Sequence, residues 1–203
     1  MAAIEAVVFD VGNVLIEWSP RYLYRKLFPD DEAAMERFLA LVCTAEWNAA
    51  QDAGRPFVCA VTELSRQYPE QAPLIAAFDE RWEEMVPGAH DDTVALVREL
   101  DERGWPLYAL TNFSREKFPL VVRRFDVFAL FDGIVVSGEI GLIKPDPAIF
   151  HHLLERYALR AEACLFIDDA EANVAAARAL GMRAIRYTGA GALRRDLAAL
   201  GLP

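Results

Sequence analysis

Short apolar runs alternate with amphipathic stretches in the second half of the chain. The apolar runs have the length and the β-branched or aromatic content of strands, and they are WPLYALT (105–111), GIVVS (133–137), ACLFID (163–168) and MRAIRY (182–187). Helices with Asp or Ser near the start, or Gly just past the end, are predicted at 91–103, 114–124, 146–157 and 169–180. Continuous apolar strands separated by helices predict a parallel sheet covered on both faces, with right-handed crossovers.

The stretch IEAVVFD (4–10) has the same strand character, but the pattern after it differs. From 20 to 86 the chain contains several helical patterns and no convincing strand, and prolines and glycines separate these patterns. An all-helical segment placed between the first strand and the rest of an α/β pattern is best explained as an insertion. We therefore predict an α/β fold with a Rossmann-like parallel sheet core at 1–17 and 88–203 and a helical cap domain at 18–87.

Composition narrows the class of protein. Hydrophobic residues make up 54% of the 203 residues, charged residues make up 26%, and the net charge is −10. These values are typical of an ordered globular protein, and the negative charge argues against a nucleic-acid partner. Apolar stretches fall short of the ~20 residues of a membrane span, and Glu5 and Asp10 interrupt the N-terminal run where a signal peptide needs an apolar core. We expect a soluble, cytoplasmic protein that has no membrane partner.

Polar side chains follow the predicted strands. They are Asp10 after VVF, Thr111 and Asn112 after LYAL, Asp168 and Asp169 after CLFI, and Lys144 in the loop GEIGLIKPDP. Because ligands bind outside the carboxyl ends of parallel strands, these groups should converge on one edge of the sheet. Taken singly, Asp169 is explained as a helix cap, Thr111 and Asn112 as turn residues, and Lys144 as a solvated loop residue. Asp10 is harder to explain this way, because a partly desolvated carboxylate is costly without a partner.

The order of these residues resembles the four motifs of the haloacid dehalogenase superfamily of aspartate-nucleophile hydrolases. The matching segments, in chain order, are FDVGNVL, LTN, KPDPAIF and FIDDAEAN. The predicted insertion lies where subfamily I carries its helical C1-type cap. The chain most resembles the branch with small bacterial sugar-phosphate phosphatases and the N-terminal domain of soluble epoxide hydrolases.

The resemblance implies a Mg²⁺-dependent phosphatase that works through an aspartyl-phosphate. Asp10 would be the nucleophile, and Lys144 would neutralise both the nucleophile and the phosphate. Thr111 and the backbone N–H of Asn112 would hold phosphate oxygens. The implied metal ligands are Asp10, the carbonyl of Gly12, Asp169 and, directly or through water, Asp168, with Asn173 orienting the groups around them.

One position departs from the family pattern. Phosphatases of this family typically carry a second aspartate two residues after the first, as the acid for the leaving group and the base for water, and here that position is Gly12. Loss of a general acid or base typically lowers the reaction rate by a factor of roughly 10²–10⁴. A leaving group that needs little help, a metal-bound or phosphate-ordered water, or Glu17 on the flap after the first motif could compensate.

Two alternatives to a phosphatase remain open at this point. A metal-independent 2-haloacid dehalogenase uses the same aspartate, but dehalogenases of this superfamily replace the double Asp with Ser and Asn, whereas this chain keeps Asp168 and Asp169. Alternatively, a catalytically impaired protein would keep the fold and bind a phosphometabolite as a regulator, and Gly12 is the observation in favour of this reading.

The cap limits the partner to a small-molecule phosphate substrate. A cap of this size can close over the sheet edge and exclude water, which suits a small phosphorylated metabolite such as a sugar phosphate and works against a protein substrate. In EWNAAQDAGRPF (46–57), Trp47 and Arg55 are candidates to face the cleft, although cap core and surface charge are the plainer readings. A monomer and a homodimer are both compatible with the sequence.

Overall fold

The central sheet places the end of the first strand in the middle of the molecule. A computed structural model describes residues 3–203, and within them the strand order is β3-β2-β1-β4-β5, with every neighbouring pair parallel. The strands are β1 (Ala6–Phe9), β2 (Leu107–Thr111), β3 (Gly133–Val136), β4 (Cys164–Asp168) and β5 (Arg183–Arg186). The predicted α/β class is therefore confirmed, and β1 is flanked by β2 and β4.

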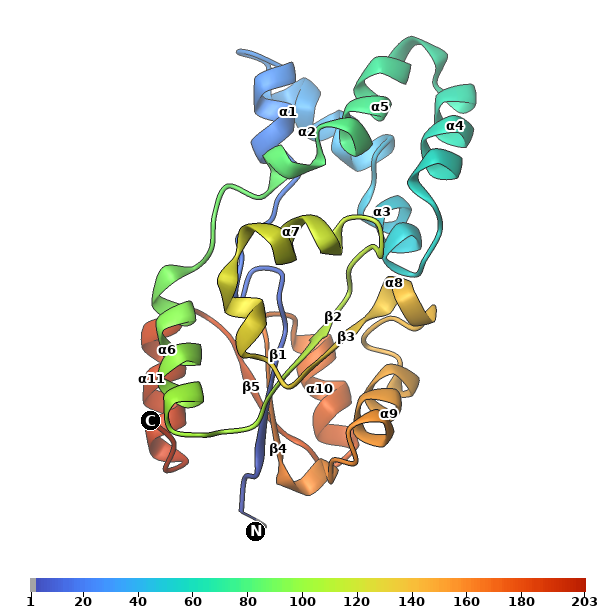
Figure 1. Cartoon of the computed structure of the whole chain (residues 1–203). Coiled ribbons are helices and arrows are strands. Elements are labelled where there is room, and N and C mark those ends of the chain that lie inside the picture. Colours follow the sequence, from blue (N-terminus) through green and yellow to red (C-terminus); the bar gives the residue numbers. More distant parts are fainter. Residues whose placement is uncertain (1–2) are drawn as a thin grey trace.

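Helices cover both faces of the sheet (Figure 1). They are α6 (Asp91–Glu102) and α11 (Ala190–Ala199) on one face, and α9 (Pro147–Arg156) and α10 (Glu171–Ala179) on the other. Because successive strand residues point to opposite faces, Val7 and Phe9 pack with α6 and α11, whereas Val8 packs with α9 and α10. Burial on both faces explains why the strands are apolar throughout rather than alternating.

The predicted helical insertion lies between β1 and β2. Its helices are α1 (Arg21–Leu27), α2 (Glu32–Leu41), α3 (Ala45–Asp52), α4 (Phe57–Gln67) and α5 (Ala72–Glu80). Tyr24 is fully buried among aromatic rings, with ring centroids 5.0 Å from Phe38 and 6.2 Å from Phe78. Its hydroxyl donates to the Leu74 carbonyl at 2.8 Å, so the buried polar atom is satisfied. The cap thus has an aromatic centre of its own.

Several contacts join the cap to the core near the sheet edge, and two of them involve Trp82 and Gly54. The ring of Trp82 lies edge-on to Phe113, with 5.5 Å between centroids. At Gly54, which has a φ of +101°, a side chain would bring its Cβ to 3.1 Å from the Gly138 carbonyl oxygen. Glycine therefore allows both the left-handed turn after α3 and the close approach of that turn to the core.

The chain enters and leaves the cap through adjacent segments. The Glu17 N–H donates to the Gly88 carbonyl at 3.0 Å, and the His90 N–H donates to the Leu15 carbonyl at 2.8 Å. Ile16 and Ala89 form an antiparallel bridge between these hydrogen bonds. The domain boundaries at 17/18 and 87/88 stay a prediction, and the two connections run side by side at that point.

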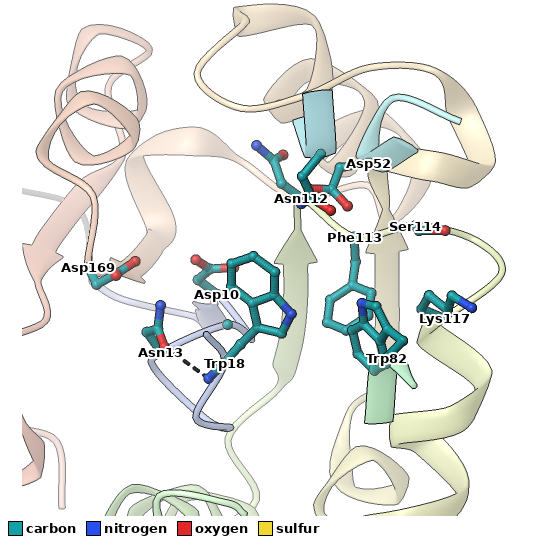
Figure 2. A pocket seen from close by; sticks show the side chains of 12 residues that line it. Asp10, Asn13, Trp18, Asp52, Trp82, Asn112, Phe113, Ser114, Lys117 and Asp169 are labelled. Carbon is teal, nitrogen blue, oxygen red and sulfur yellow. Dashed lines mark hydrogen bonds between the residues drawn. The ribbon is translucent and has the colours of Figure 1, made fainter. Parts of the chain in front are cut away.

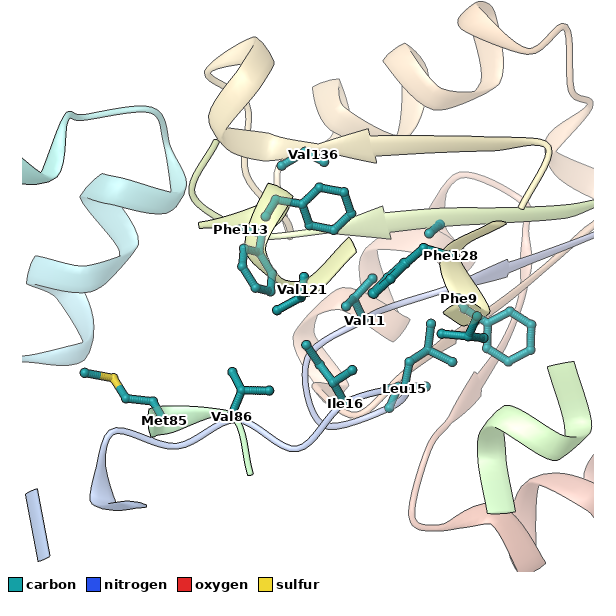
Figure 3. Packing of buried hydrophobic residues seen from close by; sticks show 14 of the residues in the cluster. Phe9, Val11, Leu15, Ile16, Met85, Val86, Phe113, Val121, Phe128 and Val136 are labelled. Atoms are coloured by element: carbon teal, nitrogen blue, oxygen red, sulfur yellow. The ribbon is translucent and has the colours of Figure 1, made fainter. Parts of the chain in front are cut away.

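The loop after β1 is anchored by apolar side chains. Val11, Leu15 and Ile16 are fully buried, and they share one cluster with Val121 and Phe128 (Figure 3). Asn13 adopts a left-handed φ of +57°, and its N–H donates to the Ile16 carbonyl at 2.7 Å. This packing holds the loop in place, and Asp10 with it.

Three helices differ from the predicted pattern, and one of them, α8 (Ser137–Ile140), lies where the loop GEIGLIKPDP was predicted. Helix α7 (Phe118–Arg124) begins four residues later than predicted, because the Ser114 hydroxyl accepts the Glu116 N–H at 3.1 Å and closes a turn there instead of starting the helix. Helix α11 lies in a stretch where no helix was predicted, directly after Gly189. Among residues 3–203, no helix is long and apolar enough to cross a membrane.

Candidate active site

Three neighbouring strands deliver polar side chains to one edge of the sheet. Asp10 directly follows β1, Thr111 ends β2 and Asp168 ends β4. All three are buried, with exposed fractions of 7%, 1% and 0%. The predicted convergence of strand-end groups therefore occurs on the central three strands.

Lys144 joins two of these carboxylates. Its ammonium lies 2.8 Å from Asp10 Oδ1 and 2.7 Å from Asp168 Oδ2, and its side chain is almost completely buried. A buried ammonium is costly in isolation, and here two carboxylates compensate it. The cluster of Asp10, Lys144 and Asp168 carries one net negative charge when all three are ionised.

The Asp168 carboxylate is fully occupied by donors. Oδ1 accepts the Ala170 N–H at 2.8 Å, and Asn173 Nδ2 lies 3.0 Å from each carboxylate oxygen. Together with Lys144, these donors make four contacts with the carboxylate. A cation bound directly by Asp168 would compete with these donors, so Asp168 is better suited to hold Lys144 and to reach a cation through water.

The carboxylates of Asp10, Asp168 and Asp169 could hold a metal ion. Each offers an oxygen atom, and these atoms lie within 4.8 Å of one another. Gly12 lines the same pocket as Asp10 and Asp169. Carboxylate and carbonyl oxygens are the hard ligands that Mg²⁺ prefers, so the residues present fit that ion.

Burial governs the ionisation of this cluster. It raises the pKa of Asp10 above its ordinary value, and the Lys144 ammonium acts in the opposite direction. Burial also raises the pKa of Asp169, and the neighbouring charge of Asp168 adds to the rise. For Lys144, burial lowers the pKa but the two carboxylates outweigh it, so the pKa is raised and the ammonium stays charged.

Asn112 and Thr111 have distinct surroundings. The Asn112 side chain donates to the Lys144 carbonyl at 2.9 Å and accepts the Lys144 N–H at 2.8 Å, which fixes the backbone that carries the lysine. The Thr111 hydroxyl is buried and has no hydrogen-bond partner within the described part of the protein. A buried hydroxyl without a partner is costly, and a ligand oxygen would satisfy it.

A cavity of about 180 Å³ opens above Asp10, between the core and the cap. Figure 2 shows Asp10 and Asp169 at one side and Trp82, Phe113 and Lys117 at the other. The remaining lining residues are Gly12, Asn13, Trp18, Asn48, Asp52, Asn112 and Ser114. The lining is thus aromatic and polar, and it adjoins the carboxylate cluster.

Glu17, Trp47 and Arg55, which the sequence suggested as acid/base and cap residues, lie outside this lining. The Glu17 carboxylate accepts a hydrogen bond from the Tyr22 hydroxyl. The Trp47 ring packs edge-on against Phe78, with centroids 5.1 Å apart, and Arg55 pairs with Glu63 at 2.5 Å. Their suggested roles stay predictions.

The cap instead presents Asn48 and Asp52 to the cavity. Both belong to α3, and Asn48 Nδ2 donates to Asp52 Oδ2 at 3.0 Å. The signal that could have found them is their spacing, because polar residues four apart on a helix share one face. Asn48 and Asp52 belong to the segment 46–57, whereas Trp47 and Arg55 of the same segment do not line the cavity.

Known proteins resemble this chain in sequence and in fold. The sequence pattern of the haloacid dehalogenase-like hydrolases matches residues 4–181. A sesquiterpene phosphatase of Aspergillus oryzae is 28% identical over 186 residues, which cover 91% of this chain and 90% of that protein. A phosphoglycolate phosphatase of Cereibacter sphaeroides is 27% identical over 198 residues, with 90% and 84% covered.

A solved structure shares the fold. It is a haloacid dehalogenase family enzyme of Bacteroides thetaiotaomicron, in complex with magnesium and inorganic phosphate. The TM-score is 0.70 at 19% sequence identity, and the match covers 92% of this chain and 96% of that one. At this identity the likeness concerns the arrangement of core and cap.

Proposed function

The chain belongs to the haloacid dehalogenase-like hydrolases, and from that membership we propose that it is a Mg²⁺-dependent phosphatase of small phosphorylated metabolites. The observation that carries the proposal is the buried cluster in which Lys144 bridges Asp10 and Asp168 while Asp169 lies close by. A single ammonium leaves this cluster acidic, and acidic groups bind a phosphate ester only when further positive charge is present.

In this proposal each side chain has a defined task. Asp10 attacks phosphorus and forms an aspartyl-phosphate, and Lys144 holds the carboxylate in place through its 2.8 Å contact. Asp10, Asp169 and the Gly12 carbonyl would hold Mg²⁺, with Asp168 reaching it through water. The bound ion would supply positive charge beside the phosphate. Asn173 keeps Asp168 oriented toward Lys144.

The phosphate would also meet neutral donors. The unpartnered Thr111 hydroxyl ends the strand beside β1, and it can donate to a phosphate oxygen. The Asn112 backbone N–H is assigned the same task, while its side chain positions the Lys144 backbone. These donors act in a site with little exposure to water, where hydrogen bonds to an anion are strong.

The cavity favours a substrate with an uncharged leaving group. Among the described lining residues Lys117 alone is cationic, and its ammonium is already paired with the Asp79 carboxylate of the cap. A second anionic group on the substrate would therefore find no unpaired positive charge there. The rings of Trp18 and Trp82 and the polar groups of Asn48 suit a sugar or another alcohol.

A panel of substrates tests this function. Phosphate release from sugar and alkyl phosphates should exceed release from phosphoglycolate, which carries a carboxylate. Halide release from 2-haloacids without metal would indicate the dehalogenase instead. Binding of phosphometabolites without turnover across the panel would indicate the regulatory protein and contradict the proposed hydrolysis.

Metal removal gives a separate prediction. Excess EDTA should lower phosphate release by about 10²-fold or more, because Asp10 and Asp169 would then face an anionic substrate without the ion's charge. Added Mg²⁺ should restore the rate, whereas added Ca²⁺, a larger ion with a different coordination preference, should restore less. Full activity in EDTA would contradict the metal-dependent mechanism.

A further inference from the structure

The proposed reaction needs a group that position 12 does not supply. The leaving oxygen must gain a proton when its bond to phosphorus breaks, and the attacking water must later lose one. Gly12 has no side chain, and a Cβ added there would meet nothing within 4 Å. The place where the family usually carries its acid and base is therefore open space at the edge of the cavity.

One carboxyl in the cavity lies outside the proposed metal site. The acidic lining residues are Asp10, Asp169 and Asp52 among the residues the structure describes, and only the first two belong to the carboxylate cluster. Figure 2 shows the Asp52 side chain among the groups that line the cavity. Asp52 is thus the carboxyl placed to meet a bound substrate without being required by the metal.

We propose that Asp52, at the end of α3 in the cap, is the general acid and base of the reaction, in place of the aspartate absent from position 12. The inference rests on the proposed phosphatase function. Asp52 would donate its proton to the leaving oxygen as Asp10 attacks and the phosphorus–oxygen bond breaks. It would then accept a proton from the water that attacks the aspartyl-phosphate, releasing inorganic phosphate and the Asp10 carboxylate.

The structure fixes Asp52 firmly. The Ser137 hydroxyl of the core donates to the Asp52 carbonyl at 2.5 Å, and that same hydroxyl accepts the Phe113 N–H at 2.8 Å. The Asn48 amide donates to the carboxylate at 3.0 Å. These contacts span cap and core, so the carboxyl is held over the sheet edge when the two are together.

The protonation of Asp52 suits both roles. Burial raises its pKa to about 7, and a hydrogen bond with the Ser114 backbone acts in the opposite direction. A group with a pKa near neutral pH can give a proton in one step and take one in the next. The charged groups on the elements around it are Asp10, Asp169, Lys117 paired with Asp79, Glu116, and the exposed Arg115 and Glu139. On or beside its own helix they are Glu46 and Arg55, which pairs with Glu63.

The test compares substrates that differ in leaving group. With an alkyl phosphate, Asp52→Asn should lower kcat by about 10²–10⁴-fold, because the alkoxide needs a proton. With p-nitrophenyl phosphate, whose leaving group needs no proton, the burst rate of p-nitrophenol release in the same variant should stay within about fivefold of the wild type. The later steady-state turnover should be slow, because hydrolysis of the aspartyl-phosphate still needs a base. Glu46→Gln, which removes a carboxylate from the exposed face of the same helix, is the matched control.

Two further variants separate chemistry from folding. In the wild type saturated with Mg²⁺, whose charge would favour the ionised form of Asp10, the single-turnover rate with an alkyl phosphate should fall as the pH rises through about 7, since the acid form of Asp52 is lost. Asn48→Ala removes a hydrogen bond to the charged form and should move that fall to higher pH. The double variant Gly12→Asp/Asp52→Asn should be at least about tenfold faster than Asp52→Asn alone, because a side chain has room at position 12.

The outcomes distinguish this inference from the proposed function. Turnover of alkyl phosphates within about threefold of wild type in Asp52→Asn would overturn the role of Asp52 and leave the phosphatase standing. An equal loss of burst and steady-state rates with an unchanged pH profile would show a structural role and overturn it too. A wild-type protein that hydrolyses no phosphate ester in the presence of Mg²⁺ would overturn both.

Discussion

Replacement of Asp10 by Asn is expected to lower hydrolysis of a phosphate ester by at least ~10⁴-fold, because an amide oxygen is too weak a nucleophile to form the aspartyl-phosphate. The amide keeps the shape of the side chain, and its oxygen can still accept from Lys144 and from the Val11 N–H, which lies 2.7 Å from the native carboxylate. The variant should therefore fold and still bind its substrate. Steady-state kinetics with phosphate detection would measure the loss.

A matched substitution controls for the change in charge. Asp92→Asn makes the same chemical change on the exposed first turn of α6 and should leave the rate near that of the wild type. Trapping of phosphate on the wild-type chain but not on Asp10→Asn would identify the attacking atom. Undiminished turnover in Asp10→Asn would rule out Asp10 as the nucleophile.

Replacement of Lys144 by Met is expected to lower the free energy of unfolding by about 3–5 kcal/mol in the presence of EDTA, because it leaves Asp10 and Asp168 buried without a counter-charge. Methionine keeps most of the volume of the aliphatic chain, so the effect reports the charge. Unpaired carboxyls have raised pKa values in the folded state. The folded variant then binds more protons than its unfolded chain, so the loss of unfolding free energy should grow as the pH rises from 5 to 8.

Lys26→Met provides the comparison for Lys144→Met. Lys26 pairs with Glu84 at 2.8 Å on the surface of the cap, where both side chains are partly exposed. Its loss should cost about 0–1 kcal/mol, since water solvates the remaining carboxylate. Denaturant unfolding of the two variants would measure the difference, and a cost below about 1 kcal/mol for Lys144→Met would contradict the role of the buried pair.

Much of the fold was readable because its signals are local. The apolar runs at β1, β2 and β4 are buried on both faces, so each one appears in the sequence without interruption. Parallel strands bring their carboxyl ends to one edge, which is why strand-end polar residues could be grouped before any geometry was known. Helix α11 escaped prediction, although Leu193 and Leu197 lie four residues apart and are both buried against the core.

The cap side of the site was harder to predict. Trp47 and Asn48 are neighbours on α3, yet one packs among the cap aromatics and the other lines the cavity. Adjacent helical residues point in different directions, and the rotation of α3 is set by its packing against the rest of the cap and against α8 (Ser137–Ile140). Such long-range contacts leave no periodic trace in the sequence, so the segment could be identified but not its inward residues.

The paired connections at Leu15–Glu17 and Gly88–His90 bear on how the chain can fold. Backbone hydrogen bonds hold the two ends of the insertion beside each other. The two connections to the core therefore meet as in a short turn, although the whole insertion separates them in the sequence. Loop-closure entropy depends on the span that must be brought together, and a folded insertion with adjoining ends adds little to it. The core can therefore carry an insertion of this size at small entropic cost.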